Sequence, residues 1–301
     1  MKVALLGTGL MGAPMARRLL AAHELSVWNR SAHKAQPLAA FGARVAASAG
    51  DAVRDAQVVI TMLEQGDAVR EVLFGDTGAA SELPRGGLVV DMSSILPTQA
   101  RDHAQRLATL GVAHLDAPVS GGTLGAEAGT LAIMVGGAQA DFERAAPIFA
   151  PLGRATHVGP SGAGQIAKLA NQMIVGITIG AVAEALLLAR RGGADPARVR
   201  EAIRGGFAES RVLEVHGQRM VEQDFAKRGA LSVQLKDMRN ALHTARELGF
   251  APPVTTLFET LYASAADHGL GELDHSALWL ELDRLAGPGG PVLDPSSRDP
   301  L

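Results

Sequence analysis

The sequence predicts an α/β protein in two parts: an N-terminal domain built on a parallel sheet and an all-helical C-terminal domain, joined by one long helix. Three observations lead to this fold class. Short apolar runs alternate with amphipathic segments in the first half of the chain, helical patterns fill the second half, and a long apolar helical pattern lies between them. A length of 301 residues suits two domains. We therefore predict domains over residues 1–161 and 162–286, and a disordered tail rich in Pro, Gly, Ser and Asp over residues 287–301.

The alternation in the first half predicts βαβ units. Short apolar runs predict strands at residues 2–7, 25–29, 56–63, 86–94 and 112–120. Amphipathic segments between them predict helices at residues 8–22, 31–42, 66–75 and 96–111. A further strand follows and ends at Gly136 and Gly137. Parallel sheets of this kind bind ligands beyond the carboxyl ends of their strands.

The second half predicts helices only. The first runs from near Gly162 to near Gly192, with glycines at both ends. The next begins with Asp195 as its N-cap and Pro196 in its first turn. Three more are predicted at residues 213–223, 231–249 and 252–269, and a last one at residues 274–286.

The junction between the first strand and the first helix is a G-x-G-x-x-G motif, Gly7 to Gly12. Its place between a strand and a helix is the context that a Rossmann dinucleotide-binding domain requires. Gly7 makes the tight turn, Gly9 lets the backbone approach a pyrophosphate, and Gly12 lets the helix pack against the strand. The N–H groups of Leu10, Met11 and the helix start face the phosphates. The alternative is a glycine turn without a ligand.

The end of the second strand distinguishes the two dinucleotides. An NAD-binding unit usually places Asp or Glu there to hold the ribose hydroxyls. This chain has Asn29, Arg30 and Ser31, with Lys34 a turn later. Without a carboxylate to repel a 2′-phosphate, and with a guanidinium to pair with it, the sequence favours NADP(H), with NAD(H) as the alternative.

Three polar residues lie on one face of the long helix. Lys168, Asn171 and Gln172 are spaced i, i+3 and i+4 near its first turns. The rest of the helix is almost entirely apolar, so we expect it to be buried. A lysine in a buried helix is costly unless it is paired or functional. The alternative is a lysine at a helix start whose ammonium group reaches water.

These motifs, in this order and at this spacing, resemble the β-hydroxyacid dehydrogenase family, which includes 3-hydroxyisobutyrate dehydrogenase. Four stretches carry the resemblance: GTGLMGAPMARRL, DAPVSGGTLGAEAGTLAIMVGG, GAGQIAKLANQ and QLKDMRNAL. The similarity extends to about Ala286. Two further stretches, GGFAESRVLEVHGQRM and LDHSALW, are most similar to members that reduce tartronate semialdehyde.

The resemblance implies a role for each site residue. Lys168 matches the catalytic lysine, the general acid/base. Lys236 matches a lysine beside the nicotinamide, and Ser94 matches a cofactor contact near the same ring. Met62 and Leu63, which end the third strand, are also assigned to the cofactor. Many family members carry Asn four positions after the lysine, where this chain has Gln172, so either Asn171 or Gln172 contacts substrate.

The segment after Asp116 matches the family's substrate-binding segment. Ser120, Gly121 and Gly122 are expected to present a hydroxyl and bare backbone N–H groups to a substrate carboxylate. A side chain at either glycine would block that approach, which explains the choice of residue. The alternative is a flexible turn before an edge strand.

The implied activity is the NAD(P)H-dependent reduction of a small aldehyde acid, tartronate semialdehyde or glyoxylate, to the hydroxy acid. The alternatives are a 3-hydroxyisobutyrate or a succinic semialdehyde/4-hydroxybutyrate dehydrogenase with the same machinery. A cofactor-binding regulatory module without activity is the non-enzyme alternative.

Composition excludes several other classes. The formal net charge of −3 and scattered arginines are untypical of a nucleic-acid binder. The chain has no cysteine and no H-E-x-x-H motif, so we expect no metal. Glycines interrupt the apolar N-terminal run and Glu184 lies in the long helix, so we expect neither a signal peptide nor a membrane span, and a cytoplasmic location. The long apolar helix suggests a homodimer or homotetramer.

Overall fold

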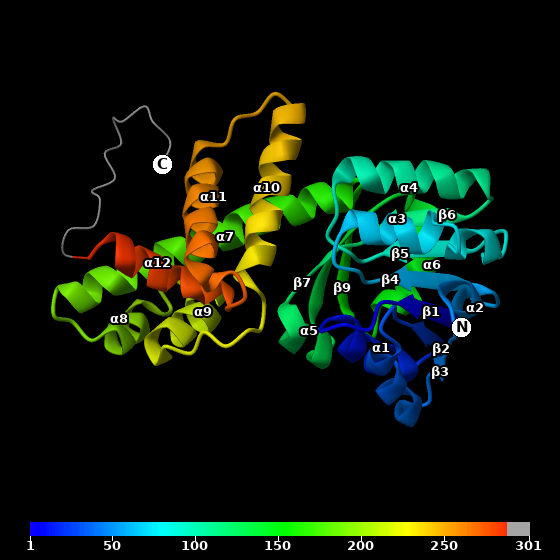
Figure 1. Ribbon diagram of the computed structural model, residues 1–301, viewed down its shortest axis with the longest axis horizontal. Coiled ribbons are helices and arrows are strands. Elements are labelled where there is room, and N and C mark those ends of the chain that lie inside the picture. The colour runs from blue at the N-terminus through cyan, green and yellow to red at the C-terminus, as the bar shows by residue number, and fades with distance from the viewer. Residues whose placement is uncertain (288–301) are drawn as a thin grey trace. The chain divides into compact units, whose positions relative to one another are not determined.

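The computed structural model describes residues 1–287 and divides the chain into two compact units (Figure 1). Unit 1 comprises residues 1–168, and the described part of unit 2 comprises residues 169–287. The division falls inside one continuous helix, α7 (Ala163–Arg191), whose first turns belong to unit 1. The predicted domains met at residues 161 and 162, just before this helix. The predicted tail, apart from Gly287, lies outside the described residues.

Unit 1 is a twisted sheet with helices on both faces, as the alternating pattern predicted (Figure 1). Its strands are β1 (Lys2–Leu6), β2 (Glu24–Trp28), β3 (Arg44–Val45), β4 (Val58–Thr61), β5 (Leu88–Asp91), β6 (Ala113–Asp116), β7 (Val119–Ser120), β8 (Leu131–Gly136) and β9 (Gly153–Gly159). Its α-helices are α1 (Gly12–Leu20), α2 (Ala49–Val53), α3 (Gly66–Phe74), α4 (Pro97–Thr109), α5 (Gly122–Ala128) and α6 (Gln139–Phe149). The 3₁₀ helices are η1 (Ala32–Lys34), η2 (Gln36–Phe41) and η3 (Ala79–Glu82).

The strand order places the predicted ligand-binding segments at one edge of the sheet. The order is β3-β2-β1-β4-β5-β6-β8-β7, with β9 paired to β8. Strands β1 to β6 are all parallel, so their carboxyl ends meet at the same edge. The predicted parallel sheet is confirmed for β1 to β6, whereas β8 runs antiparallel to both β6 and β7. Strands β6 and β7 therefore run in the same direction, and the chain reverses into β8 after α5.

Two apolar layers enclose the sheet. Val3 and Leu5 of β1 belong to the cluster on one face, and Ala4 and Leu6 belong to the cluster on the other. This alternation follows from the two-residue period of a strand, and burial on both faces accounts for the continuous apolar runs in the sequence. Apolar packing on both faces of the sheet therefore fixes the positions of the strand ends.

The segment 31–42 differs from its prediction. It forms the two 3₁₀ helices η1 and η2, where the sequence predicted an α-helix. Pro37 lacks an N–H group, and within these two helices only Leu38 is buried. The segment thus lacks the apolar face that stabilises an α-helix by packing.

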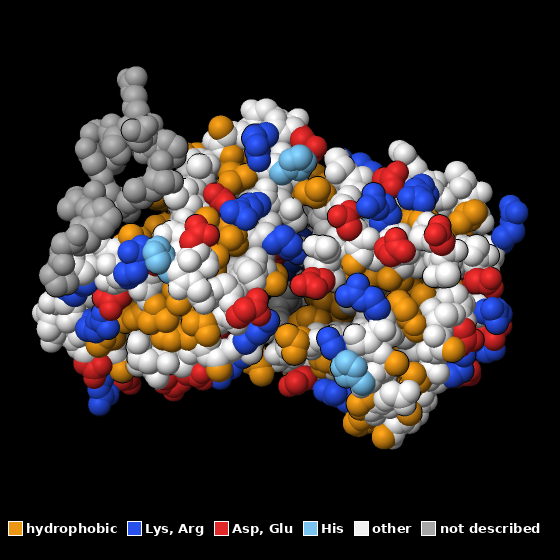
Figure 2. Space-filling model, viewed as in Figure 1, with side chains coloured by type: hydrophobic (Ala, Val, Ile, Leu, Met, Phe, Trp, Pro, Cys, Tyr) orange, Lys and Arg blue, Asp and Glu red, His pale blue; other side chains and the backbone are white. Residues whose placement is uncertain are grey.

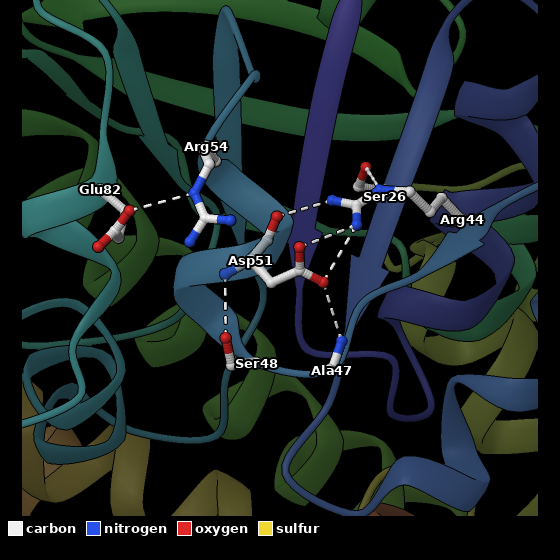
Figure 3. A network of polar contacts seen from close by, with 7 residues as sticks. All are labelled: Ser26, Arg44, Ala47, Ser48, Asp51, Arg54 and Glu82. Carbon is white, nitrogen blue, oxygen red and sulfur yellow. Dashed lines mark hydrogen bonds and ion pairs between the residues drawn. The ribbon is translucent and has the colours of Figure 1, made fainter.

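A network of hydrogen bonds and an ion pair joins strands β2 and β3 to helix α2 in unit 1 (Figure 3). The Arg44 guanidinium donates to Ser26 Oγ and to both carboxylate oxygens and the carbonyl of Asp51. Asp51 also accepts from the N–H of Ala47, and Ser48 caps α2 by accepting from Asp51 N. These bonds hold the pKa of the Asp51 carboxyl below its usual value. Arg44 is consequently occupied within the protein.

Unit 2 is helical, as predicted. After α7 come α8 (Pro196–Ile203), α9 (Arg211–Glu222), α10 (Leu231–Glu247), α11 (Pro253–Ala265) and α12 (Leu278–Leu285). A π-helical turn (Ala266–Leu270) follows α11, and a 3₁₀ helix (His275–Ala277) precedes α12. The predicted Asp195 cap is confirmed, because its carboxylate accepts from Ala197 N.

Helix α7 is long and apolar enough to cross a membrane by length and composition. Three of its side chains, Ile179, Ala183 and Leu186, are fully buried in the core of unit 2. They pack there with Tyr262 and Trp279. This part of α7 is therefore the central helix of a folded unit.

Candidate active site

The glycine loop lies at the carboxyl end of β1. Gly7 donates its N–H to Trp28 O at 2.8 Å, which joins the loop to β2. A Cβ on Gly12 would lie 1.9 Å from Gly7 O, so only glycine lets α1 start this close to the strand. A Cβ on Gly9 would meet no protein atom within 4 Å. Leu10 and Met11 continue the loop into the first turn of α1. The open backbone at Gly9, in front of a helix N-terminus, suits a pyrophosphate.

The segment after β2 joins the same loop. Asn29 Oδ1 accepts from Thr8 N at 3.0 Å, and Asn29 Nδ2 donates to Ser31 O at 3.1 Å. Arg30 between them is exposed and, within residues 1–287, makes no ion pair, in contrast to Arg44 (Figure 3). Arg30, the residue after Asn29, is thus accessible from solvent.

The ends of β4 and β5 are held together by a buried carboxyl group. Asp91 Oδ1 accepts from Thr61 Oγ1 at 2.8 Å and from Ser93 N at 3.0 Å. Ser93 Oγ in turn accepts from Leu63 N at 3.0 Å. Burial raises the pKa of Asp91 to about 6, against the effect of these hydrogen bonds. Met62, Leu63 and Ser94 therefore lie on two loops that share one network.

Lys168 is hydrogen-bonded to the segment that was predicted to bind the substrate. Its side chain is buried on α7, and Nζ donates to Val119 O at 2.8 Å. Val119 and Ser120 form β7, and Gly121 and Gly122 follow with φ of +138° and +62°. Glycine is favoured at both positions, because other residues are strained there. The ammonium group is thus bonded to the carbonyl of the residue that directly precedes the Ser-Gly-Gly turn.

A second buried carboxylate, that of Asp116, caps the N-terminus of helix α7. Asp116, at the end of β6, accepts from Gly162 N at 2.7 Å and from Gln165 N at 2.9 Å. Burial raises the pKa of Asp116, and these hydrogen bonds oppose that rise. A carboxylate at a helix N-terminus satisfies N–H groups that the helix itself leaves unpaired.

In unit 2, the predicted polar residues form a separate network. Gln172 Nε2 donates to Asp237 Oδ2 at 2.8 Å and to Gln234 Oε1 at 3.1 Å. Gln172 Oε1 accepts from Asn171 Nδ2 at 2.8 Å. Lys236 Nζ lies 3.3 Å from Asp237 Oδ1. Gln172 therefore joins α7 to α10 and orients Asn171.

The structure thus gathers the predicted residues in two groups. Unit 1 holds those of the glycine loop, the β2, β4 and β5 ends, the Ser-Gly-Gly turn and Lys168. Unit 2 holds Asn171, Gln172 and Lys236. The sequence reasoning did not single out Gln165, Asp237 or the helix-capping role of Asp116. The strand-end position of Asp116 and the place of Gln165 one turn before Lys168 were the available signals.

The surface shows no strongly charged area on the face in Figure 2. Lysine and arginine side chains lie among aspartate and glutamate side chains there. Within residues 1–287, no group of three or more His, Cys, Asp or Glu side chains could hold a metal ion.

Comparison with known families and proteins gives matches over nearly the whole chain. The family model for the NAD binding domain of 6-phosphogluconate dehydrogenase matches residues 2–159. The model for the NAD-binding of NADP-dependent 3-hydroxyisobutyrate dehydrogenase matches residues 162–281. The 2-hydroxy-3-oxopropionate reductase of Escherichia coli (strain K12) is 43% identical over 288 residues, which are 95% of this chain and 98% of the relative.

Two solved structures share the fold. A Mycobacterium tuberculosis 3-hydroxyisobutyrate dehydrogenase with L-serine is 33% identical with a TM-score of 0.85, covering 93% of this chain and 98% of that chain. Psf3 in complex with NADP+ and 2-OPP is 27% identical with a TM-score of 0.86, covering 93% and 99%. The glycine loop, the long helix and these matches agree on one conclusion: the chain belongs to the β-hydroxyacid dehydrogenase family of nicotinamide-dependent oxidoreductases, together with 3-hydroxyisobutyrate dehydrogenase.

Proposed function

We propose that the protein reduces a small aldehyde acid to the corresponding hydroxy acid with NADPH, and that tartronate semialdehyde is its first candidate substrate. The position of one amine carries the proposal: Lys168 Nζ is buried 2.8 Å from Val119 O, beside Ser120 and the two glycines. The 43% identity to a 2-hydroxy-3-oxopropionate reductase supports this substrate over others. Glyoxylate is a smaller compound of the same chemical class.

The protein groups have distinct tasks in this reaction. NADPH, when bound, supplies the hydride that forms the new C–H bond. Lys168 hydrogen-bonds the carbonyl oxygen and transfers a proton to it as negative charge develops, leaving a neutral amine that water reprotonates. Ser120 Oγ and the N–H groups of Gly121 and Gly122 hold the substrate carboxylate. The result is an alcohol, with hydride and proton both accounted for.

Of the two amides on α7, Asn171 is the better substrate contact. Gln172 uses its Nε2 for Asp237 and Gln234 and its Oε1 for Asn171. Asn171 is half-buried and is held in place by that last bond. We therefore assign the substrate contact to Asn171 and a supporting role to Gln172.

The cofactor assignment follows from the residues around the glycine loop. The Gly7–Gly12 loop and the β4 and β5 ends would hold the dinucleotide, with Arg30 and Ser31 at the 2′-phosphate and Lys236 toward the nicotinamide. Arg30→Ala should weaken NADPH binding by roughly ten- to a hundredfold and leave NADH binding within about threefold, because a charge-assisted bond to the phosphate is lost. Fluorescence titration with both cofactors measures this. Equal losses for the two would contradict a phosphate contact.

A substrate panel tests the proposed activity. Purified full-length protein is mixed with NADPH and, separately, tartronate semialdehyde, glyoxylate, succinic semialdehyde and methylmalonate semialdehyde, and NADPH absorbance is followed. We expect the highest kcat/KM with tartronate semialdehyde. A higher value for methylmalonate semialdehyde would favour a 3-hydroxyisobutyrate dehydrogenase, and one for succinic semialdehyde a 4-hydroxybutyrate dehydrogenase. No oxidation with any aldehyde acid would refute the enzyme.

We also propose a homodimer or homotetramer in the cytoplasm. Ile174 and Leu188 of α7 are 67% and 75% exposed, and Phe250, Val254 and Leu257 are exposed on unit 2 as well. A contiguous exposed apolar surface marks an association site, and we propose that these side chains belong to one. Light scattering of the purified protein measures the number of subunits, and a monomer would contradict the proposal.

A further inference from the structure

One glutamine of helix α7, Gln165, is hydrogen-bonded to the loop after β5 and lies in the helix that carries Lys168. This loop, residues 92–96, contains Ser94 and is named the Ser94 loop. Gln165 is fully buried in the first turns of α7. Its Oε1 accepts from Ile95 N at 3.1 Å, and its Nε2 donates to Ser93 O at 2.8 Å. The side-chain amide of Gln165 is thus hydrogen-bonded to the main chain on both sides of Ser94.

The same residue ends a chain of bonds that starts at β6. Gln165 N donates to Asp116 Oδ2, and Asp116 Oδ1 accepts from Gly162 N. A Cβ on Gly164 would lie 2.4 Å from Asp116 O, so the helix start lies directly on the strand end. The first turn of α7 is therefore fixed to β6 and, through the Gln165 side chain, to the loop after β5.

Lys168 lies three residues after Gln165, on the same face of the helix. A shift of the first turn would carry the ammonium group with it. We infer that Gln165 is a positioning residue, which sets the distance between the Lys168 ammonium and the Ser94 loop for the reduction. The inference rests on the proposed function, because it assigns Gln165 a task in that reaction.

The chemistry of the site requires an amide. One side-chain atom must accept from Ile95 N and another must donate to Ser93 O. An ionised carboxylate accepts only, so it would face the Ser93 carbonyl oxygen without a proton between them. A protonated carboxyl group has the size of the amide and restores both bonds. Methionine has a similar length and makes neither bond.

These differences define the experiment. Gln165→Met should lower kcat by roughly ten- to a hundredfold, since small misplacements of a reacting group cost that much, with the KM for NADPH within about threefold. Gln165→Glu should resemble Gln165→Met at about pH 8.5 and approach the wild type at about pH 5.5, because burial raises the pKa of the introduced carboxyl. The ratio of the variant's kcat to that of the wild type should thus rise at least about fivefold as the pH falls.

Gln99→Met is the matched control. Gln99 Oε1 accepts from Leu96 N in the same loop, but this side chain lies against Gly66 and has no bond to α7. We expect Gln99→Met to lower the melting temperature and leave kcat within about twofold of the wild type. A Gln165→Met variant that only lowers the melting temperature, with unchanged kcat, would show a structural role alone and overturn the inference. A kcat ratio for Gln165→Glu that is independent of pH would also overturn it.

Hydrogen exchange separates this inference from the proposed function. In Gln165→Met, the N–H of Ile95 should exchange at least about tenfold faster than in the wild type, while the N–H groups of β4 exchange as before. Faster exchange at Ile95 in Gln165→Met, together with a wild-type protein that reduces no aldehyde acid, would remove the proposed function and retain the bond of Gln165 to the loop. Unchanged exchange at Ile95 would overturn the positioning role, whatever the activity.

Discussion

The buried carboxyl groups of the two units are stabilised in different ways. In unit 1, Asp91 and Asp116 accept from backbone N–H groups and a hydroxyl, and within residues 1–287 neither forms an ion pair with Lys or Arg. In unit 2, both oxygens of Asp274 accept from Arg219 Nη1, at 2.9 and 2.8 Å. Burial raises the pKa of Asp91, whereas the Ser276 hydrogen bond and the Arg219 charge hold the pKa of Asp274 below its usual value despite burial.

The difference follows from what each carboxyl group holds. Asp91 and Asp116 fix main-chain segments that lead to the candidate site. Asp274 fixes helix α9 to the start of the segment before α12, where no ligand is expected. The two buried carboxyl groups of unit 1 thus order loops with neutral donors, whereas Asp274 of unit 2 joins its segments with a charged partner as well.

Breaking the Arg219–Asp274 pair should have the largest effect on stability. Arg219→Met leaves Asp274, which is 1% exposed, without its cation, and should lower the free energy of unfolding by about 3 kcal/mol or more. Urea denaturation measures this. The exposed pair of Arg198 and Glu201 gives the control, since Arg198→Met should cost at most about 1 kcal/mol. Equal losses in the two variants would contradict the comparison.

Buried histidines should make the protein sensitive to acid. Burial lowers the pKa of His114 from 6.5 to about 3, and that of His103 and His216 to about 4. Between pH 6.5 and 4 the unfolded chain therefore binds protons that the folded chain does not, and stability falls as the pH falls. His114→Leu should remove about 2 kcal/mol of the loss between about pH 7.5 and 5, as measured by urea denaturation at both pH values. Parallel pH curves for the variant and the wild type would contradict this assignment.

Asp91 should act in the opposite direction and more weakly. Its folded pKa of about 6 lies above the ordinary 3.8, so its favourable contribution is complete below pH 3.8 and is lost as the pH rises through 6. Asp91→Asn should therefore gain about 1 to 1.5 kcal/mol relative to the wild type between about pH 5 and 8. Asp274→Asn, whose folded pKa is lowered, should show no such gain over this range. A gain in both variants would remove the distinction between the units.

Much of this architecture could be predicted because it depends on local patterns. The strands and helices follow from apolar spacing, the glycine loop from Gly7, Gly9 and Gly12, and the long helix from its composition. The 3₁₀ helices at residues 32–41 could not, because their instability as an α-helix depends on how little of the segment is buried. The reversal of β8 could not either, since its pairing with β6 is a long-range contact.

In the candidate site, too, some features could be predicted from the sequence and others could not. The position of Lys168 on a polar helix face was predicted from residue type and spacing. Its catalytic role and the role of the Ser-Gly-Gly turn are what the family resemblance implies. The bonds of Gln165 to Asp116 and Ser93 join residues 49 and 72 positions apart, and no local pattern records such a pairing. The open choice between Asn171 and Gln172 depended on Gln234 and Asp237, which approach only in the folded chain.

The central claim is that the Lys168 ammonium group donates the proton, and single-turnover kinetics of Lys168→Ala test it most directly. The rate of NADPH oxidation with tartronate semialdehyde should fall by about a thousandfold, with NADPH affinity within about threefold of the wild type. Added methylammonium should restore part of the rate in proportion to its concentration, because it supplies the missing acid. A rate within a few fold of the wild type, or a loss explained by weaker NADPH binding alone, would contradict the account.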